Sequence, residues 1–140
     1  MATVRKEIQT RACPAEAWAA IRDIGALHTR LVPGFVTDTR LEPGARIVTF
    51  GNGTVVREPI ITIDEPAQRL VWTVEGGRTT HYNASAQVIP QADGTSHVVW
   101  TADFLPDSAA SAIDAMMSHG AAVMKTTLDQ AALCSGQTAS

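Results

Sequence analysis

The residues best suited to chemistry are a glutamate and a tyrosine on two predicted strands. Arg57 and Glu58 lie in the run 51–64, GNGTVVREPIITID, which is typical of a β-strand. Successive strand side chains point to opposite faces, so one of these two charged residues must face the interior. A carboxylate there has its charged form disfavoured, which raises its pKa toward the range of a general acid or base. If Glu58 is the inward residue, Glu58 and Tyr82 are the candidate catalytic residues.

Two roles for Glu58 stay open at this point. The carboxylate can pair with Arg46 or another basic residue and only shape a pocket or orient a ligand. Alternatively it can transfer protons, with the Tyr82 hydroxyl donating a hydrogen bond to a ligand carbonyl or orienting Glu58.

Other residue types that bind metals or catalyse reactions give weaker signals. His81 and His97 fall on the outward faces of their predicted strands, and His28 lies near the expected mouth of a pocket. His119 stands beside Gly120, and no two histidines have the spacing of metal ligands on one element. There is no nucleophile–base pair, phosphate loop or Rossmann fingerprint. We therefore predict no metal site and no cofactor.

The composition restricts the classes of function. The 140 residues are 45% hydrophobic and 18% charged, as in a folded domain. A net charge of -3 without a basic cluster argues against nucleic-acid binding. The N-terminus lacks the apolar segment of a secretory signal, and no apolar run approaches about 20 residues, so we expect a cytoplasmic protein without membrane insertion. Cys13 and Cys134 lack paired spacing, and we expect both to be thiols without a functional disulfide.

Turn signals divide the chain into short elements followed by one long one. A strand at 3–11 precedes a helix that begins at Pro14 and a short helix at 23–31. Strands are then predicted at 35–41, 46–50, 54–64, 69–75, 81–89 and 95–104. The segment from Asp107 or Ser108 to Leu133 is predicted as one long helix. The chain is expected to form a single domain over 1–134 with a flexible tail at 135–140.

Two of the strands alternate cleanly, which indicates an antiparallel sheet covered on one face. The inward residues on these strands are Tyr82, Ala84, Ala86 and Val88, and Val98, Trp100, Ala102 and Phe104. The apolar side of the 107–133 helix supplies the cover. The fold predicted is α+β, with about seven strands in the order β-α-α-β6-α curved around the C-terminal helix. Large and small residues mix on the inner face, so either a cavity or a filled core can result.

This order of elements and turns resembles the SRPBCC or START-like helix-grip superfamily of birch-pollen-allergen-like proteins, and within it the polyketide cyclase/dehydrase group. The resemblance covers about Val4 to Leu133. Its motifs are Pro14-Ala-Glu-Ala-Trp18, Asp23-Ile-Gly-Ala-Leu27, Pro33-Gly34, Arg57-Glu58, Ile63-Asp64-Glu65, Tyr82 and Trp100-Thr-Ala-Asp-Phe104. The run Arg30-Leu31-Val32-Pro33 departs from the pattern of the polyketide cyclase/dehydrase group. The short loop at 51–53 departs from that of the plant hormone receptors, which are more distantly similar.

The resemblance implies a pocket between the sheet and the long helix, with Glu58 inward, six residues before Asp64, and Arg57 outward. Pro59 is expected on the outer face at an edge or bulge position. The ligand-binding residues implied in this way are Val48, Val56, Glu58, Ile60, Trp72, Val74, Tyr82, Ala84, Trp100, Ala112, Met116 and Gly120.

The function that the resemblance implies is binding of a small hydrophobic or polycyclic ligand, with cyclase or dehydratase activity if the protein is an enzyme. The alternative is a non-catalytic protein-interaction or stress/chaperone-regulating module of the same fold. An open cavity would favour the first function, and a filled core with an exposed apolar patch would favour the second. We expect a small hydrophobic molecule as the partner of a monomer or homodimer.

Overall fold

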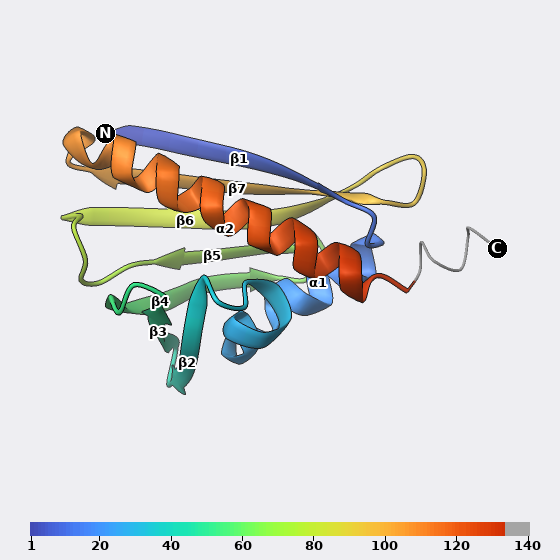
Figure 1. Cartoon of the computed structure of the whole chain (residues 1–140), viewed down its shortest axis with the longest axis horizontal. Coiled ribbons are helices and arrows are strands. Elements are labelled where there is room, and N and C mark those ends of the chain that lie inside the picture. The colour runs from blue at the N-terminus through green and yellow to red at the C-terminus, as the bar shows by residue number, and fades with distance from the viewer. Residues whose placement is uncertain (134–140) are drawn as a thin grey trace.

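A seven-stranded antiparallel sheet and one long helix form the two layers of this computed structural model, which describes residues 1–133 (Figure 1). The strands lie in the spatial order β1-β7-β6-β5-β4-β3-β2. Their bounds are β1 Ala2–Thr10, β2 Val36–Glu42, β3 Ala45–Phe50, β4 Val55–Asp64, β5 Arg69–Thr73, β6 His81–Pro90 and β7 Ser96–Leu105. The α+β fold predicted from the sequence is confirmed.

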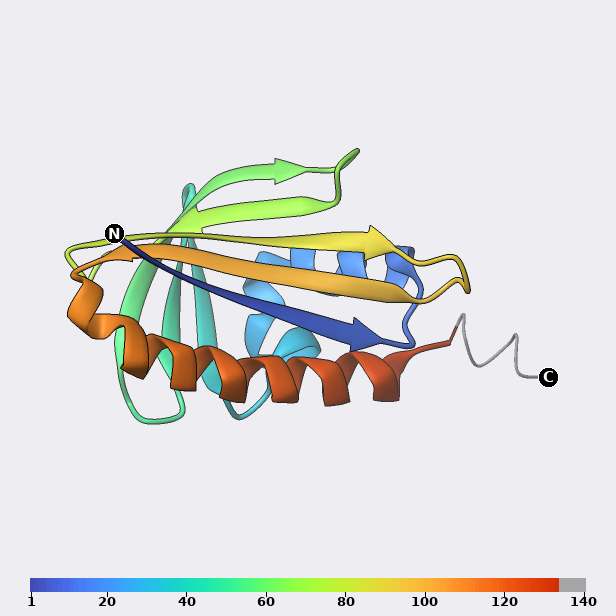
Figure 2. The ribbon, with the colours of Figure 1, turned by 90° about the horizontal axis from the view of Figure 1, so that it is seen from above.

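The helices lie on one side of the sheet. Helix α1 (Pro14–Arg22), the 3-10 turn η1 (Ile24–Ala26) and the π turn η2 (Leu27–Leu31) connect β1 to β2. After β7 come the 3-10 turn η3 (Asp107–Ala109) and the long helix α2 (Ala110–Ala131). Figures 1 and 2 show α2 running along the sheet, with β2, β3 and β4 bent toward it. None of the helices in residues 1–133 has the length and apolarity required to cross a membrane.

The structure differs from the predicted elements at several points. The segment 23–31 forms two short turns in place of one helix, and Gly25 lies in the first of them. The long helix starts later than predicted, because η3 occupies residues 107–109. Cys13 is disulfide-bonded, so the expected thiol is wrong at this position. Cys134 and the predicted tail 135–140 lie outside the described residues.

Strand β4 divides its pairing between two neighbours. Residues 55–59 pair with β3 and residues 60–64 pair with β5. The register shifts between Ile60 and Thr62, which makes Ile61 the extra residue of a bulge. Pro59 pairs with Ala45 inside the sheet, so the predicted edge or bulge position for Pro59 is wrong by two residues.

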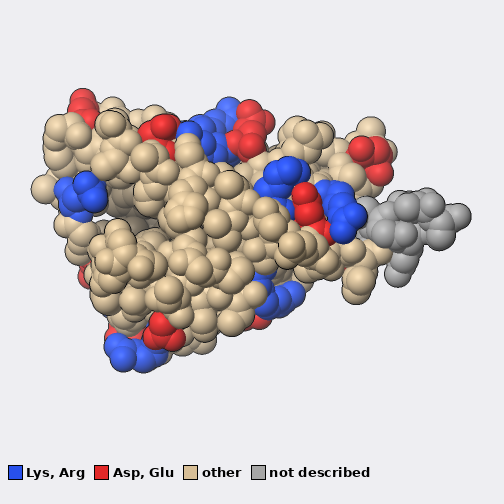
Figure 3. All heavy atoms as spheres, in the orientation of Figure 1, with Lys and Arg blue, Asp and Glu red and all other residues tan. Residues whose placement is uncertain are grey.

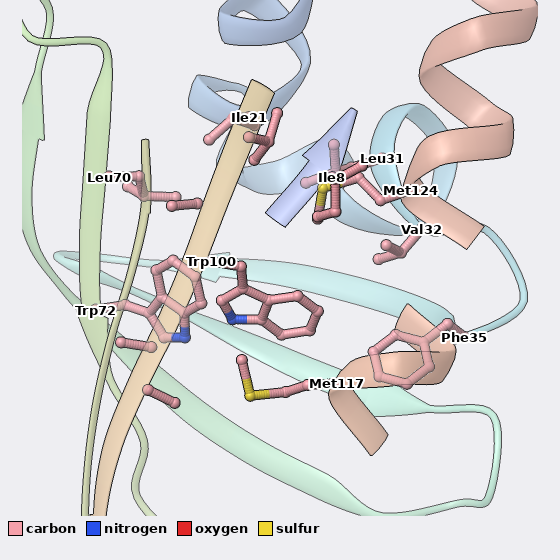
Figure 4. Packing of buried hydrophobic residues seen from close by; sticks show 14 of the residues in the cluster. Ile8, Ile21, Leu31, Val32, Phe35, Leu70, Trp72, Trp100, Met117 and Met124 are labelled. Carbon is pink, nitrogen blue, oxygen red and sulfur yellow. The ribbon is translucent and has the colours of Figure 1, made fainter. Parts of the chain in front are cut away.

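The inner face of the sheet carries large side chains next to alanines. Across β5, β6 and β7, Trp72 lies opposite Ala84, which lies opposite Ala102. In the next row, Leu70 lies opposite Ala86, which lies opposite Trp100. All the inward residues predicted on β6 and β7 are buried, which confirms the face assigned to both strands. Figure 4 shows Trp72 and Trp100 beside Met117, with Ile21, Leu31 and Met124 further along the interior.

Asp129 links the end of α2 to the end of β1 through hydrogen bonds. Its carboxylate accepts hydrogen bonds from Thr10 Oγ1 at 2.6 Å, from the Arg11 backbone N–H at 3.0 Å and from Lys125 Nζ at 3.1 Å. Burial acts to raise the pKa of Asp129, but the hydrogen bonds from Thr10, Arg11 and Lys125 together hold the pKa below its ordinary value. The charged carboxylate is therefore the form that stabilises the fold.

Replacing Asp129 by alanine should lower the free energy of unfolding by about 1–3 kcal/mol at pH 7, because three donors lose their acceptor. Because the pKa of Asp129 is lower in the folded state, its carboxylate stabilises the fold at any pH above the pKa of the unfolded state, near 3.8. This contribution is lost as the pH falls through the pKa of the folded state. The difference from wild type should therefore shrink below about pH 4 in urea titrations. Asp114→Ala is the control, since Asp114 makes only an exposed ion pair with Lys6 and its loss should change stability by under about 1 kcal/mol. Equal losses in the two variants would contradict this role.

Candidate functional site

A cavity of about 650 Å³ lies between the inner face of the sheet and α2. Its wall combines residues of β3–β7, the segment 31–36, the loops 51–54 and 76–79, Ile21 of α1 and the part of α2 from Ala112 to Met124. Figure 3 shows the surface hollowed at the left of the view, in the region where the loops of the β5–β6 and β3–β4 connections approach α2 in Figure 1. Of the two outcomes left open by the sequence, the structure shows the cavity.

The predicted ligand-binding residues fall into two groups. Those that line the cavity are Val56, Glu58, Trp72, Val74, Tyr82, Trp100, Ala112 and Met116. The residues that do not line it are Val48, Ile60, Ala84 and Gly120. Ala84 is buried between its cross-strand partners Trp72 and Ala102, and Gly120 is covered by the Trp100 and Phe35 rings, whose atoms would lie 3.0 Å from an added Cβ. Val48 is fully buried in the sheet, and Ile60 adjoins the bulge of β4. Contact with a ligand stays a prediction for all of them.

A buried ion pair stands in the wall of this cavity. Arg46 on β3 and Glu58 on β4 are direct cross-strand partners, so both side chains leave the sheet on the same face. Arg46 Nε donates to Glu58 Oε1 at 2.8 Å, and the two side chains are only 4% and 7% exposed. The Arg46 guanidinium also lies 5.5 Å from the centre of the Trp72 ring. The structure thus places Glu58 inward and pairs it with the arginine considered from the sequence.

Arg57 lies on the opposite face of β4. It donates to Glu42 at 2.9 Å and to Glu75 at 2.7 Å, and its side chain is 40% exposed. The adjacent charged residues of β4 therefore form one buried ion pair and one exposed ion-pair network.

The interior changes the acid–base properties of Glu58 and Tyr82. Burial raises the pKa of the Glu58 carboxyl, and the charge and hydrogen bond of Arg46 offset this effect only in part. Burial also raises the pKa of Tyr82, and the negative charge of Glu58 adds to that rise. Tyr82 therefore stays a neutral hydrogen-bonding group, and the two side chains share one electrostatic environment.

Phe35 and Phe50, two aromatic residues that the sequence analysis missed, line the cavity. Phe35 meets Phe50 edge to face at 5.5 Å between ring centres, and it meets His119 in the same way at 5.3 Å. The loops that carry the two phenylalanines touch, since Gly51 N–H donates to Phe35 O and an added Cβ at Gly51 would lie 2.6 Å from Gly34 O. The signal available was a phenylalanine next to a glycine at each turn. His28, predicted near the mouth, does not line the cavity.

Within residues 1–133, no group of three or more His, Cys, Asp or Glu side chains is placed to hold a metal ion. The polar groups of the cavity are suited to hydrogen bonding and proton transfer.

The comparison with protein families identifies the chain. Residues 1–132 match the profile of the family described as "Polyketide cyclase / dehydrase and lipid transport". The chain belongs to this family. The resemblance stated from the sequence is thereby confirmed, and with it the helix-grip fold. No curated protein matches the chain.

Solved structures support the same assignment of fold. A protein from Thermobifida fusca is 30% identical, with a TM-score of 0.74 over 98% of this chain and 95% of that one. The di-domain ARO/CYC BexL of the BE-7585A biosynthetic pathway is 14% identical, with a TM-score of 0.79 over 91% of this chain and 46% of BexL. Norcoclaurine synthase from Thalictrum flavum, in complex with dopamine and hydroxybenzaldehyde, is 16% identical, with a TM-score of 0.71 over 92% of this chain and 84% of that one. At 14% and 16% identity, the last two share the fold alone.

Proposed function

We propose that this protein binds a small hydrophobic, ring-bearing molecule between the sheet and α2 and catalyses a cyclase or dehydratase reaction on it. The observation that carries the proposal is the cavity of about 650 Å³ with an acid, Glu58, buried in its wall. Small-molecule sites enclose about 300–1,000 Å³ and combine apolar walls with a few placed polar groups. This cavity agrees with both features.

The reaction proposed needs one proton-transfer group and one donor. Arg46 Nε is bonded to Oε1 of Glu58, so Oε2 is the oxygen that approaches the ligand. Glu58 takes a proton from a carbon between two keto groups, and Tyr82 donates a hydrogen bond to the enolate oxygen that forms. The carbanion closes the ring on a second carbonyl, and the proton returns from Glu58 to the resulting alkoxide. In a dehydration that follows, Glu58 takes the second proton from the same carbon and delivers it to the new hydroxyl, which leaves as water as the carbon–carbon double bond forms.

Two comparisons support this class of reaction. The family description includes cyclases and dehydrases, and one neighbour of the same fold is an ARO/CYC protein of a biosynthetic pathway. Another neighbour holds two small aromatic molecules. The alternative, a protein-interaction or stress/chaperone-regulating module, is less well supported because the interior is not filled. A cytoplasmic location and a monomeric or homodimeric state remain part of the proposal.

Ligand binding can be tested by blocking the cavity. Ala112 lines it from α2, whereas Ser111, the preceding residue, is exposed and does not. Ala112→Phe should weaken binding of the fluorescent probe 1-anilinonaphthalene-8-sulfonate at least about tenfold, since a phenyl ring occupies the space of the probe. Ser111→Phe, with the same added ring, should leave the dissociation constant unchanged in a fluorescence titration. Equal affinities for the two variants would show that the probe binds elsewhere and would contradict the proposed site.

A further inference from the structure

One arginine of the cavity wall has no partner in the protein. Within residues 1–133, the lysine and arginine side chains that make no hydrogen bond or ion pair are Arg40, Arg69 and Arg78. Of these three, only Arg78 lines the cavity, and it is exposed. Arg46, the other arginine of the wall, is buried and bonded to Glu58. Because Arg78 is open to solvent and also lines the cavity, it lies at the mouth, where a ligand can reach it.

The loop that carries Arg78 is held in place at both ends. Before it, the backbones of Arg57 and Glu75 exchange two hydrogen bonds, at 3.0 and 2.7 Å. After it, Thr80 N–H donates to Leu105 O at 2.8 Å. Figure 3 shows basic atoms at the edge of the hollow in the surface. The backbone of the sheet therefore fixes the place of this arginine at the mouth.

The charges around the cavity leave one positive charge over. Glu58 is the acid of the described lining, and Arg46 compensates it at 2.8 Å. Glu75, which precedes the loop, is paired with Arg57 at 2.7 Å. The charge of Arg78 is thus compensated by no carboxylate of residues 1–133. The whole chain carries a net charge of -3, so this positive charge does not belong to a generally basic surface.

The chemistry of the guanidinium indicates which group fits at the mouth. The wall also holds the neutral donors Asn52, Thr54, Thr79, Tyr82, His119 and the indoles, each of which can serve an uncharged polar atom as well as an anion. A guanidinium, in contrast, presents parallel N–H groups that match the two oxygens of a carboxylate. Since Arg78 is exposed, a carboxylate bound there keeps part of its hydration and avoids the cost of burying a charge.

We propose that Arg78 binds a carboxylate of the ligand at the mouth of the cavity, while the apolar body of the ligand lies inside. This proposal rests on the proposed function, because it needs the cavity to bind a small molecule. It adds a specificity-determining residue and the orientation of the ligand, a singly charged acid with its charged end outward. A poly-β-keto acid held in this way presents to Glu58 the keto carbons that are remote from its carboxyl group.

Two probes of nearly equal shape test this role. 2-Naphthoate carries a carboxylate, and 2-naphthamide has a neutral amide in its place. Arg78→Gln should weaken naphthoate binding about five- to tenfold in isothermal titration calorimetry and leave naphthamide binding within about twofold, as expected for one partly hydrated charge pair. Arg40→Gln, the matched control, removes an exposed arginine that does not line the cavity and should change neither affinity. A naphthoate preference that survives Arg78→Gln, or an equal loss in Arg40→Gln, would overturn the proposal.

A second variant separates the charge from the rest of the side chain. Arg78→Lys keeps a positive charge on a similar stem, so it should bind naphthoate at least about twofold more tightly than Arg78→Gln does. Equal affinities of these two variants would show that the charge does not hold the carboxylate, and would overturn the proposal. Binding of both probes to wild type with the same affinity would overturn the role of Arg78 alone, whereas binding of neither probe would overturn the proposed function itself.

Discussion

Replacing Arg46 by methionine is expected to lower the free energy of unfolding by about 3–5 kcal/mol at pH 7. Arg46 and Glu58 are both almost completely buried, and the arginine supplies a hydrogen bond to the carboxylate as well as the compensating charge. Without it, Glu58 must either stay charged in an apolar wall or take up a proton at neutral pH. Methionine keeps the volume similar and can still contact Trp72, so the loss reports mainly the uncompensated charge.

Urea unfolding followed by circular dichroism measures this loss, and two variants serve as controls. Arg57→Met removes the neighbouring arginine from the exposed face of the same sheet region, where the ion pairs are hydrated, so it should cost under about 1 kcal/mol. Arg46→Met combined with Glu58→Leu removes both charges and should recover most of the stability, because a buried pair is often replaceable by apolar side chains. If the double variant were no more stable than Arg46→Met, the uncompensated charge would not be the cause.

Replacing Glu58 by glutamine is expected to reduce turnover of a cyclisable substrate by about 10²–10⁴-fold. Glutamine keeps the shape of the side chain but cannot accept the proton from carbon. Ring closure of a synthetic poly-β-ketone, followed by the absorbance of the aromatic product, measures the rate. Glu75→Gln changes an exposed glutamate that pairs with Arg57 and should leave the rate unchanged. Unchanged turnover in Glu58→Gln would remove the catalytic assignment and leave Glu58 as a residue that shapes the pocket.

The same variant tests the direction of the pKa shift. A carboxyl whose pKa is raised in the folded state contributes its full stabilisation at a pH below the pKa of the unfolded state, near 4.5. This contribution is lost as the pH rises through the pKa of the folded state. Wild type should therefore lose stability relative to Glu58→Gln as the pH increases from about 4.5 upward. A gain of wild type over the variant in that range would mean that pairing with Arg46 outweighs burial.

The sequence was most informative where side-chain alternation was strict. On β6 and β7, period two alone assigned every inward residue, since a residue that points the wrong way there would expose an apolar side chain. On β4, alternation alone did not decide whether Arg57 or Glu58 faces inward, and only the resemblance predicted Glu58. The cross-strand register that joins Glu58 to Arg46 depends on the turn between β3 and β4, which fixes pairing in three dimensions.

The lining of the cavity was harder to predict, for a physical reason. Alternation gives the face of a residue but not what covers it. Ala84 and Gly120 are both buried yet do not line the cavity, and at Gly120 the Trp100 and Phe35 rings from other elements cover the backbone. Phe35 and Phe50 lie at turns, where no period applies, so their place in the cavity wall depends on loop contacts. Ile60 packs against the core next to the bulge at Ile61, but it does not line the cavity.

The rows of indoles and alanines on the inner face have a consequence for how such a protein diverges. The hydrogen bonds between the strands join backbone atoms, which are the same for nearly every residue type. The shape of the cavity, by contrast, is set by the side chains. Exchanging an alanine with the large residue opposite it would move the hollow sideways without altering the strand pairing. The shape of the cavity can therefore change in evolution while the architecture is conserved, in keeping with neighbours that share this fold at 14–30% identity.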